Sequence, residues 1–252
     1  MVFIIELSAF LVQIKIIIKQ VKTIIITGAS SGIGKATALK LSKDSNNRLV
    51  LISRNKAKLN NLLFEINDKQ NRITAIPFDL ISGDYNKLSL QIKEIAGTVD
   101  VLINNAGALV NKPFSEIKHD DFDLVVNTNF KGPFFLIQQL LPLLNSGAHI
   151  VNISSMGGYQ GSVKFPGLSA YSSSKGALAT LTECLALEFK QKGVSVNCLA
   201  LGSVQTDMLS EAFPGYLAPL TSESMADYIA DFALNGHKWM NGKILPISLS
   251  TP

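Results

Sequence analysis

TGASSGIG at residues 27–34 joins an apolar run, KTIIIT at 22–27, to a helix-forming segment over about 33–43. A strand, a glycine turn and a helix in this order bring free backbone N–H groups and the positive end of the helix to one place, where a nucleotide diphosphate binds. Glycines allow the sharp turn and the close approach of the phosphates. The stretch therefore predicts a nucleotide-binding strand–turn–helix unit of an α/β fold.

The spacing of the glycines in this turn distinguishes three kinds of nucleotide-binding site. A P-loop requires GxxxxGK[ST], but Ala29 stands where its first glycine belongs and Ala36 where its magnesium-binding hydroxyl belongs. The GxGxxG form would start at Gly32, and its third glycine falls on Thr37. The spacing that remains is GxxxGxG. A purely structural glycine turn is the alternative, and the flanking strand and helix favour a ligand site.

Apolar strand-like runs alternate along the chain with segments of helical period. This alternation predicts one α/β domain over residues 21–252, a doubly wound, mostly parallel seven-stranded sheet with helices on both faces, the Rossmann fold. The expected strands are residues 22–27, 48–52, 73–78, 99–103, 149–153, 194–199 and 243–247. The expected helices are residues 33–43, 55–70, 88–95, 122–144, 171–190 and 225–234.

Composition argues against several classes of partner. Charged residues make up 17% of the 252, the net charge is +4, and the lysines are scattered, which favours a solvated surface over a nucleic-acid face. The two cysteines are too few for a disulfide framework, and the three histidines lack a metal-ligand spacing. We therefore expect no metal site, no nucleic-acid partner and a cytoplasmic protein.

The first 20 residues are nearly all apolar, but Glu6, Gln13 and Lys15 interrupt them. That pattern is poor for a membrane span and poor for a signal peptide, so we expect no membrane association. Two interpretations of residues 1–20 stay open. They are either a genuine apolar extension or untranslated sequence upstream of a GTG start codon at Val21.

Tyr171 and Lys175 lie four residues apart on an expected helix and share one face. A phenol has an ordinary pKa near 10, and a nearby ammonium favours the phenolate. Such a phenol can give a proton to a carbonyl oxygen or take one from an alcohol. The spacing alone is common by chance in helices, so its neighbours decide what it means.

Two strand ends supply those neighbours. Ser154 and Ser155 end the expected fifth strand, at the carboxyl edge where α/β sheets bind ligands, and a serine hydroxyl there can hold a substrate carbonyl. The sequence NNAG at residues 104–107 ends the fourth strand and suits a flat ligand passing over the backbone. Each motif taken alone is also an ordinary turn signal.

In this order and spacing, TGASSGIG (27–34), NNAG (104–107), ISS (153–155) and YSSSK (171–175) resemble the short-chain dehydrogenase/reductase family over about residues 21–247. The resemblance implies that Tyr171 is the general acid/base. It implies that Lys175 lowers the pKa of Tyr171 and binds the nicotinamide ribose, and that Ser155 polarises the carbonyl. Asn129, rather than the nearby Asn127, matches an asparagine that helps a water chain relay protons.

The resemblance also implies a set of cofactor contacts around the strand ends. Asp79 and Leu80 match a pair that contacts adenine, while Val204 and Thr206 fit contacts to the carboxamide and diphosphate. The remaining expected cofactor residues are Gly28, Ser30, Ser31, Gly32, Ile33, Gly34, Ser53, Arg54, Asn105, Ala106, Gly107, Tyr171 and Lys175.

The end of the second strand indicates which nicotinamide cofactor is used. NAD sites of this type place an acid there to accept hydrogen bonds from the ribose 2′-hydroxyl. Here Ser53 stands at that position and Arg54 follows it. A guanidinium suits a 2′-phosphate, and Ser30 and Ser31 can add hydroxyls. We therefore expect NADP(H), with a solvated strand-end arginine as the alternative.

Three departures from the family pattern fall near the substrate pocket and subunit contacts. Leu201-Gly202 stands where Pro-Gly is usual, the gap from Ser155 to Tyr171 is long, and the tail SLSTP lacks a Gly-Gly ending. Residues 207–220 are the expected lid, short and apolar. The substrate is expected to be a small carbonyl compound or alcohol.

The resemblance further implies a homodimer or homotetramer formed through the long helices. Two other functions are alternatives to an oxidoreductase. A low-activity NADP-binding regulatory protein of the same fold has no need for the full set of Asn129, Ser155, Tyr171 and Lys175. An epimerase or dehydratase of an extended relative needs a longer C-terminal substrate region than the roughly 50 residues after the sixth strand.

Overall fold

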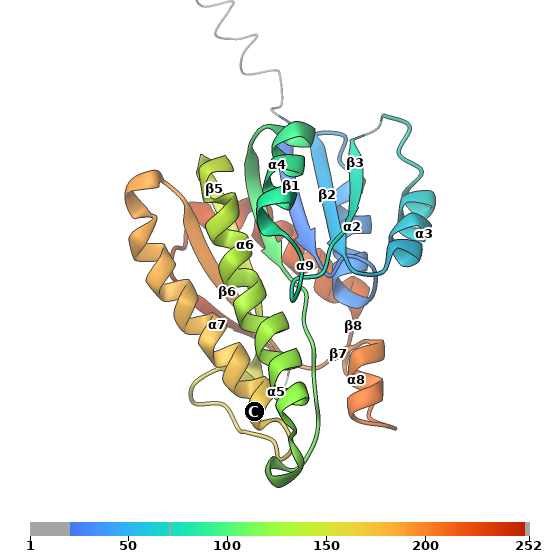
Figure 1. Ribbon diagram of the computed structural model, residues 1–252, viewed down its shortest axis with the longest axis vertical. Helices are drawn as coiled ribbons and strands as arrows, with labels where there is room; N and C mark the ends of the chain where they lie inside the picture. The colour runs from blue at the N-terminus through green and yellow to red at the C-terminus, as the bar shows by residue number, and fades with distance from the viewer. Residues whose placement is uncertain (1–20, 71, 250–252) are drawn as a thin grey trace, which may run out of the picture.

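The computed structural model describes residues 21–70 and 72–249, so both interpretations of residues 1–20 lie outside the described residues. Seven strands form one sheet in the order β3-β2-β1-β4-β5-β6-β9. Figure 1 labels β1, β2, β3, β5 and β6 of this sheet. Every neighbouring pair is parallel. The predicted doubly wound fold is confirmed. The strands are β1 (Lys22–Thr27), β2 (Asn47–Ser53), β3 (Ile73–Pro77), β4 (Val99–Asn104), β5 (Leu144–Ser155), β6 (Ser195–Leu201) and β9 (Ile244–Ile247).

Side chains of the central strands alternate between two apolar layers, because successive residues of a strand point to opposite faces. In β1, Ile24 and Ile26 pack on one side of the sheet and Ile25 on the other, all fully buried. Such strands have no polar face because helices cover both sides of a parallel sheet. The chain reverses its winding between β1 and β4, which leaves a crevice at their carboxyl ends.

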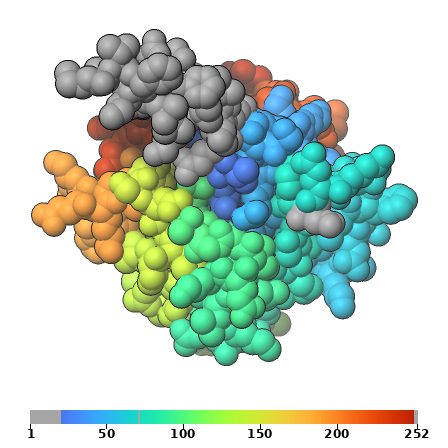
Figure 2. All heavy atoms as spheres, turned by 90° about the horizontal axis from the view of Figure 1, so that it is seen from above, coloured from blue at the N-terminus to red at the C-terminus, as the bar shows by residue number. Residues whose placement is uncertain are grey.

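Three helices cover each face of the sheet. One layer contains α2 (Gly32–Ser42), α3 (Lys56–Ile66) and α9 (Ser222–Asn235). The other contains α4 (Tyr85–Ala96), α6 (Gly132–Leu140) and α7 (Ser169–Glu188). Viewed from above, the blue start of β1 lies between the green residues of the second layer and the orange-red C-terminal residues (Figure 2). Among residues 21–70 and 72–249, no helix combines the length and apolar character needed to cross a bilayer.

The predicted long helix over 122–144 is wrong. The segment consists of α5 (His119–Val126), a π-helical turn (Asn127–Lys131), α6 and a 3-10 turn (Leu141–Leu143). Pro133 and Pro142 explain the breaks, since a proline has no N–H to continue the helical hydrogen bonds. Residue 144 already belongs to β5, because the apolar run LLPLL ends in a 3-10 turn that leads directly into this strand.

A second, two-stranded sheet flanks residues 207–220, the expected lid. In it, β7 (Val204–Gln205) pairs with β8 (Leu220–Thr221), and α8 (Asp207–Ala212) lies between them in sequence. Gln205 fastens this unit, because its side-chain oxygen accepts from Ala218 N (2.9 Å) and its carbonyl from the Ser222 hydroxyl (2.9 Å). Strands of two residues are too short to be recognised from sequence periodicity.

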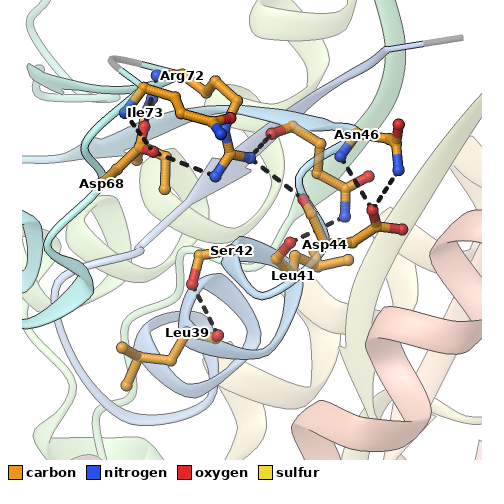
Figure 3. A network of polar contacts seen from close by, with 10 residues as sticks. Leu39, Leu41, Ser42, Asp44, Asn46, Asp68, Arg72 and Ile73 are labelled. Atoms are coloured by element: carbon orange, nitrogen blue, oxygen red, sulfur yellow. Dashed lines mark hydrogen bonds and ion pairs between the residues drawn. The ribbon is translucent and has the colours of Figure 1, made fainter.

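A polar network links β2 to the turn before β3 at the amino ends of these strands, whereas the crevice lies at the carboxyl ends (Figure 3). Arg72 Nη1 donates to the carbonyls of Asn47 (2.8 Å) and Asp44 (3.2 Å), and Arg72 Nη2 donates to Asp68 (3.1 Å). Asp68 also accepts from the backbone N–H of Ile73 (3.1 Å). Burial raises the pKa of Asp68, but its hydrogen bonds outweigh burial and leave that pKa below its ordinary value. The network fixes the start of β3 and lies far from the crevice.

Candidate active site

A cavity of about 830 Å³ opens at the carboxyl ends of the strands. Its wall includes Thr27 at the end of β1, Ser53 at the end of β2, Asn105 after β4 and Ser155 at the end of β5. Of the site residues expected from sequence, it is lined by Gly28, Ser30, Ser31, Gly32, Ile33, Ser53, Arg54, Asp79, Leu80, Asn105, Ala106, Gly107, Ser155, Tyr171, Lys175, Val204 and Thr206. Gly34 and Asn129 do not line it.

The glycine loop is packed too tightly for side chains at two of its positions. Gly28 has a φ of +67°, and a Cβ there would lie 2.8 Å from the Cα of Ala106. A Cβ on Gly34 would lie 2.3 Å from the Gly28 carbonyl oxygen and 2.4 Å from Asn105 Nδ2. Gly34 therefore shapes the loop from behind rather than facing the cavity.

The loop presents the open end of a helix to the cavity. Ser31 is the N-cap of α2, but its side chain makes no capping hydrogen bond. The first N–H groups of a helix have no partner within it and carry the positive end of the helix dipole. Ser31, Gly32 and Ile33 all line the cavity, so these donors suit an anionic group such as a diphosphate.

Thr27 and Asn105 join the two strands at which the winding reverses. Thr27 Oγ1 accepts from the backbone N–H groups of Asn105 (3.1 Å) and Ala106 (3.1 Å). The side chain of Asn105 donates back to the Thr27 carbonyl (3.0 Å). These bonds hold residues 105–107 beside the glycine loop, where the lack of a side chain on Gly107 leaves room for a flat ligand.

At the far end of the cavity, beside β2, the Ser30 and Ser53 hydroxyls lie 2.7 Å apart and form a hydrogen bond. Arg54 is exposed and lines the same region. Within the described residues its guanidinium has no hydrogen bond or ion pair. Asp79 lines the cavity next to β3, where its carboxylate accepts from Ile81 N (3.0 Å) and Ser82 Oγ (3.1 Å).

Tyr171, Lys175 and Ser155 meet at the centre of the cavity wall. The Ser155 hydroxyl accepts from the backbone N–H of Gly157 (3.1 Å) and lines the cavity with the Tyr171 phenol. Lys175 Nζ lies 5.9 Å from the centre of the Tyr171 ring and donates to the Ile153 carbonyl (2.8 Å). Lys175 is only 4% exposed, and the Ser154 hydroxyl holds its backbone carbonyl (2.9 Å). The end of β5 and the first turns of α7 thus bring a hydroxyl, a phenol and an ammonium to the same cavity wall.

Burial shifts the pKa of both ionisable groups toward the neutral form. It lowers the pKa of Lys175 to about 8. It raises the pKa of Tyr171, and the influence of the Ser155 hydroxyl acts in the opposite direction. The phenol is therefore protonated at neutral pH in the cofactor-free protein and available as an acid.

Asn129 lies in the π-helical turn, fully buried behind the cavity wall. Its side-chain oxygen accepts from Ala108 N (2.7 Å), and its amide donates to the Ala108 carbonyl (2.9 Å) and to Ser174 Oγ (3.0 Å). All of these bonds are internal. The side chain of Asn129 thus fastens the loop after β4 to α7, the helix that carries Tyr171 and Lys175.

Thr206 connects the small sheet to the glycine loop. Its side chain caps α8 by accepting from Leu209 N (3.2 Å), and its methyl would lie 3.3 Å from a Cβ on Gly32. Val204 is buried beside it. The start of α8 therefore packs against the glycine loop that precedes α2.

Sequence reasoning missed part of the cavity wall. Leu109, Met156, Val163, Phe165 and Leu168 line it, and none was expected to. Four of these five belong to the long stretch between Ser155 and Tyr171. Apolar side chains within a glycine-rich loop were the signal that could have identified them.

These features fit a nicotinamide dinucleotide, which the structure does not contain. The open end of α2 suits the diphosphate, and Gly28, Gly32 and Gly107 on the cavity wall let a ligand come close to the backbone. Lys175 makes one hydrogen bond with its ammonium and can donate to ribose hydroxyls. Among residues 21–70 and 72–249, no group of three or more histidine, cysteine or acidic side chains is arranged for a metal ion.

Comparisons with known proteins agree with this geometry. Residues 22–216 match the family model described as short chain dehydrogenase. The chain is 35% identical over 193 residues to the 3-oxoacyl-[acyl-carrier-protein] reductase FabG of Staphylococcus epidermidis, covering 74% of this chain and 77% of the relative.

Two solved structures share the fold. A short chain dehydrogenase from Burkholderia cenocepacia in complex with NADP is 26% identical, with a TM-score of 0.81 over 91% of this chain and 97% of that one. The 3-ketoacyl-(acyl-carrier-protein) reductase from Brucella melitensis complexed with NADH is 24% identical, with a TM-score of 0.80 over 90% and 97%. Since one neighbour holds NADP and the other NADH, likeness alone does not select the cofactor.

Proposed function

This chain belongs to the short chain dehydrogenase family, and we propose that it is an NADP(H)-dependent oxidoreductase that interconverts a carbonyl compound and an alcohol. One observation carries the proposal. The side chains of Tyr171, Ser155 and Lys175 line one cavity together with the open end of α2.

The reaction needs a proton at the carbonyl oxygen and a partner for the charge that develops there. In reduction, Tyr171 donates its phenolic proton to that oxygen and Ser155 donates a hydrogen bond to it. When bound, NADPH supplies the hydride. Lys175, protonated below about pH 8, favours the phenolate that Tyr171 leaves behind. In oxidation, Tyr171 takes the proton from the alcohol.

Asn129 enters this proposal as a positioning residue. Its side chain contacts neither cavity nor substrate, and its hydrogen bonds to Ala108 and Ser174 fix the distance between the NNAG loop and α7. A role in a proton relay through water remains the implication of the family resemblance.

The preference for NADP(H) over NAD(H) rests on the end of β2. Ser53 lies where an acid would repel a 2′-phosphate, and its hydroxyl is bonded to that of Ser30. Beside it, the Arg54 guanidinium has no partner in the described part of the chain and offers a planar set of donors. The nearest acid on the cavity wall, Asp79, already accepts two hydrogen bonds.

We also propose a homodimer or homotetramer. The helices expected to pair between subunits leave large apolar side chains in water, including Phe134 and Phe135 of α6 and Leu187 of α7. Unpartnered apolar surface of this kind favours association. Light scattering at micromolar concentration tests this, and a strictly monomeric mass contradicts it.

The proposed reaction is tested by mixing the protein with NADPH and a panel of aldehydes and ketones and following the loss of NADPH. Carbonyl-dependent oxidation is the expected result. If NADPH binds but no carbonyl compound is reduced, and NADP⁺ oxidises no alcohol, the protein is a nucleotide-binding regulator and the proposal is wrong.

A further inference from the structure

Two segments distant in sequence form an apolar wall on the cavity beyond Tyr171. One is the long stretch between Ser155 and Tyr171, and the other is α8 with the residues after it. We define the apolar wall as Met156, Val163, Phe165, Leu168, Met208, Leu209, Phe213 and Tyr216, all of which line the cavity.

The apolar wall keeps much of its surface in water at the mouth of the cavity. Val163 is 55% exposed, Phe165 50% and Met208 39%, whereas Met156 and Leu168 are buried at its base. Large apolar side chains gathered on a concave surface mark a ligand site, because a ligand removes them from water. Hydrogen bonds from Asn111 to the Ala212 carbonyl (2.9 Å) and between Ser203 and Tyr216 (2.9 Å) hold the second segment in place.

Charge is nearly absent from this side of the cavity. Four charged residues line the whole cavity: Arg54, Asp79, Lys175 and Asp207. Arg54 and Asp79 lie beside β2 and β3, and Lys175 lies next to Ile153, so only Asp207, at the start of α8, adjoins the apolar wall. Lys164 lies in the first segment, but its ammonium donates to the Tyr159 carbonyl (2.5 Å) and to Ser162 Oγ (2.8 Å) and does not line the cavity. An anionic substrate would find no cation along the apolar wall and would lie near a carboxylate.

We infer that the substrate is an uncharged ketone or secondary alcohol with an extended apolar body that packs between Phe165 and Met208. This inference rests on the proposed function and adds the class of substrate to it. Carboxylates and phosphates are disfavoured because their charge would be desolvated without a partner. Each methylene that enters the space between the two segments contributes binding through removal from water.

A series of methyl ketones from 2-butanone to 2-decanone, with NADPH, tests the inference. We expect kcat/KM to rise about two- to fourfold for each added methylene until the wall is covered. The compound 9-oxodecanoate matches 2-decanone in length but ends in a carboxylate, and we expect its kcat/KM to be at least tenfold lower. A flat series, or equal use of the two ten-carbon ketones, overturns the inference.

Variants link the effect to the wall. Phe165→Ala and Met208→Ala are expected to reduce the gain in kcat/KM per added methylene across the ketone series. Phe64→Ala is the matched control, since Phe64 is 87% exposed on α3 and lies outside the cavity. If kcat/KM rises with ketone length as steeply in both wall variants as in the wild type, the apolar wall does not bind the substrate chain.

A binding measurement separates failure of the inference from failure of the proposed function. Calorimetric titration of the protein with NADPH present, which cannot react with an alcohol, should show tighter binding of 2-decanol than of 9-hydroxydecanoate. If no carbonyl compound is reduced but this order of affinity holds, the inference stands and the proposed reaction is wrong. If ketones are reduced but the carboxylate binds as tightly, the reaction stands and the inference is wrong.

Discussion

The hydroxyls of Ser30, in the glycine loop, and Ser53, at the end of β2, lie 2.7 Å apart. This contact places two neutral hydroxyls where a carboxylate would hold a ribose 2′-hydroxyl. Arg54 follows Ser53 and lines the same part of the cavity. We therefore propose that this corner of the cavity decides between NADP(H) and NAD(H), which substitutions can test.

Arg54→Ala should lower the ratio of kcat/KM with NADPH to kcat/KM with NADH. A charge-assisted hydrogen bond contributes about 1.5–3 kcal/mol, which corresponds to roughly a 10- to 150-fold change in this ratio. Lys58→Ala, close by on α3 but outside the cavity, is the control and should leave the ratio unchanged. Equal use of both cofactors by the wild type would remove Arg54 from this role.

Gly34→Ala should weaken both the fold and dinucleotide binding. The new Cβ would lie 2.3 Å from the Gly28 carbonyl oxygen, so the glycine loop must shift. We expect a loss of about 1–3 kcal/mol in the free energy of unfolding and at least a tenfold weaker NADPH affinity. Thermal unfolding and fluorescence titration measure the two effects.

Gly176→Ala provides the contrast on α7. Its Cβ would come no closer than 3.5 Å to the Gly158 carbonyl oxygen, an ordinary contact. Since alanine favours helix by about 0.5–1 kcal/mol over glycine, this variant should be as stable as the wild type or more so. If both substitutions had the same effect, tight packing at Gly34 would not be the cause.

Acid should destabilise the protein through His149, which is fully buried in strand β5. Its Nδ1 lies 3.0 Å from the Ala233 carbonyl oxygen and its Nε2 3.0 Å from Asn197 Nδ2, which together define a neutral ring. Burial lowers the pKa of His149 to about 4 from an ordinary 6.5. Between these values the unfolded chain binds a proton that the folded protein does not. Its contribution to stability is therefore complete above pH 6.5 and lost as the pH falls toward 4.

The expected loss is about 3 kcal/mol in the free energy of unfolding, since one pKa unit corresponds to about 1.36 kcal/mol. Urea unfolding at several pH values between 7 and 4 measures it. His149→Gln should remove most of the slope, whereas His119→Gln, an exposed residue on α5, should retain it. An equal slope in the His149 variant would assign the acid sensitivity to other groups.

The sequence was most informative where chemistry is local. The glycine loop and the serine pair each sit at the end of an apolar strand, and parallel strands bring their carboxyl ends to one edge. For that reason, most expected cofactor residues do line one cavity. The parallel sheet follows from the same alternation of strands and helices.

Other features depend on tertiary packing that no local pattern contains. The π-helical turn at Asn127–Lys131 arises inside a run with ordinary helical period, and it buries Asn129 behind the wall. Phe165 and Met208 are more than 40 residues apart in the chain, so their place on one wall follows only from how the stretch before α7 and the helix α8 meet at the cavity. Pro133 and Pro142 mark these helix breaks in the sequence, but the apolar residues around them predict one continuous helix.

The central claim is that the Tyr171 phenol is the acid and base of a carbonyl–alcohol oxidoreductase, and Tyr171→Phe tests it most directly. The measurement is kcat for reduction of the best ketone substrate with saturating NADPH, alongside NADPH affinity by titration. Tyr228→Phe, on α9 and outside the cavity, is the control. The account predicts a kcat lowered by about 10²–10⁴-fold in Tyr171→Phe with NADPH affinity nearly unchanged. Turnover at the wild-type rate in that variant would contradict it.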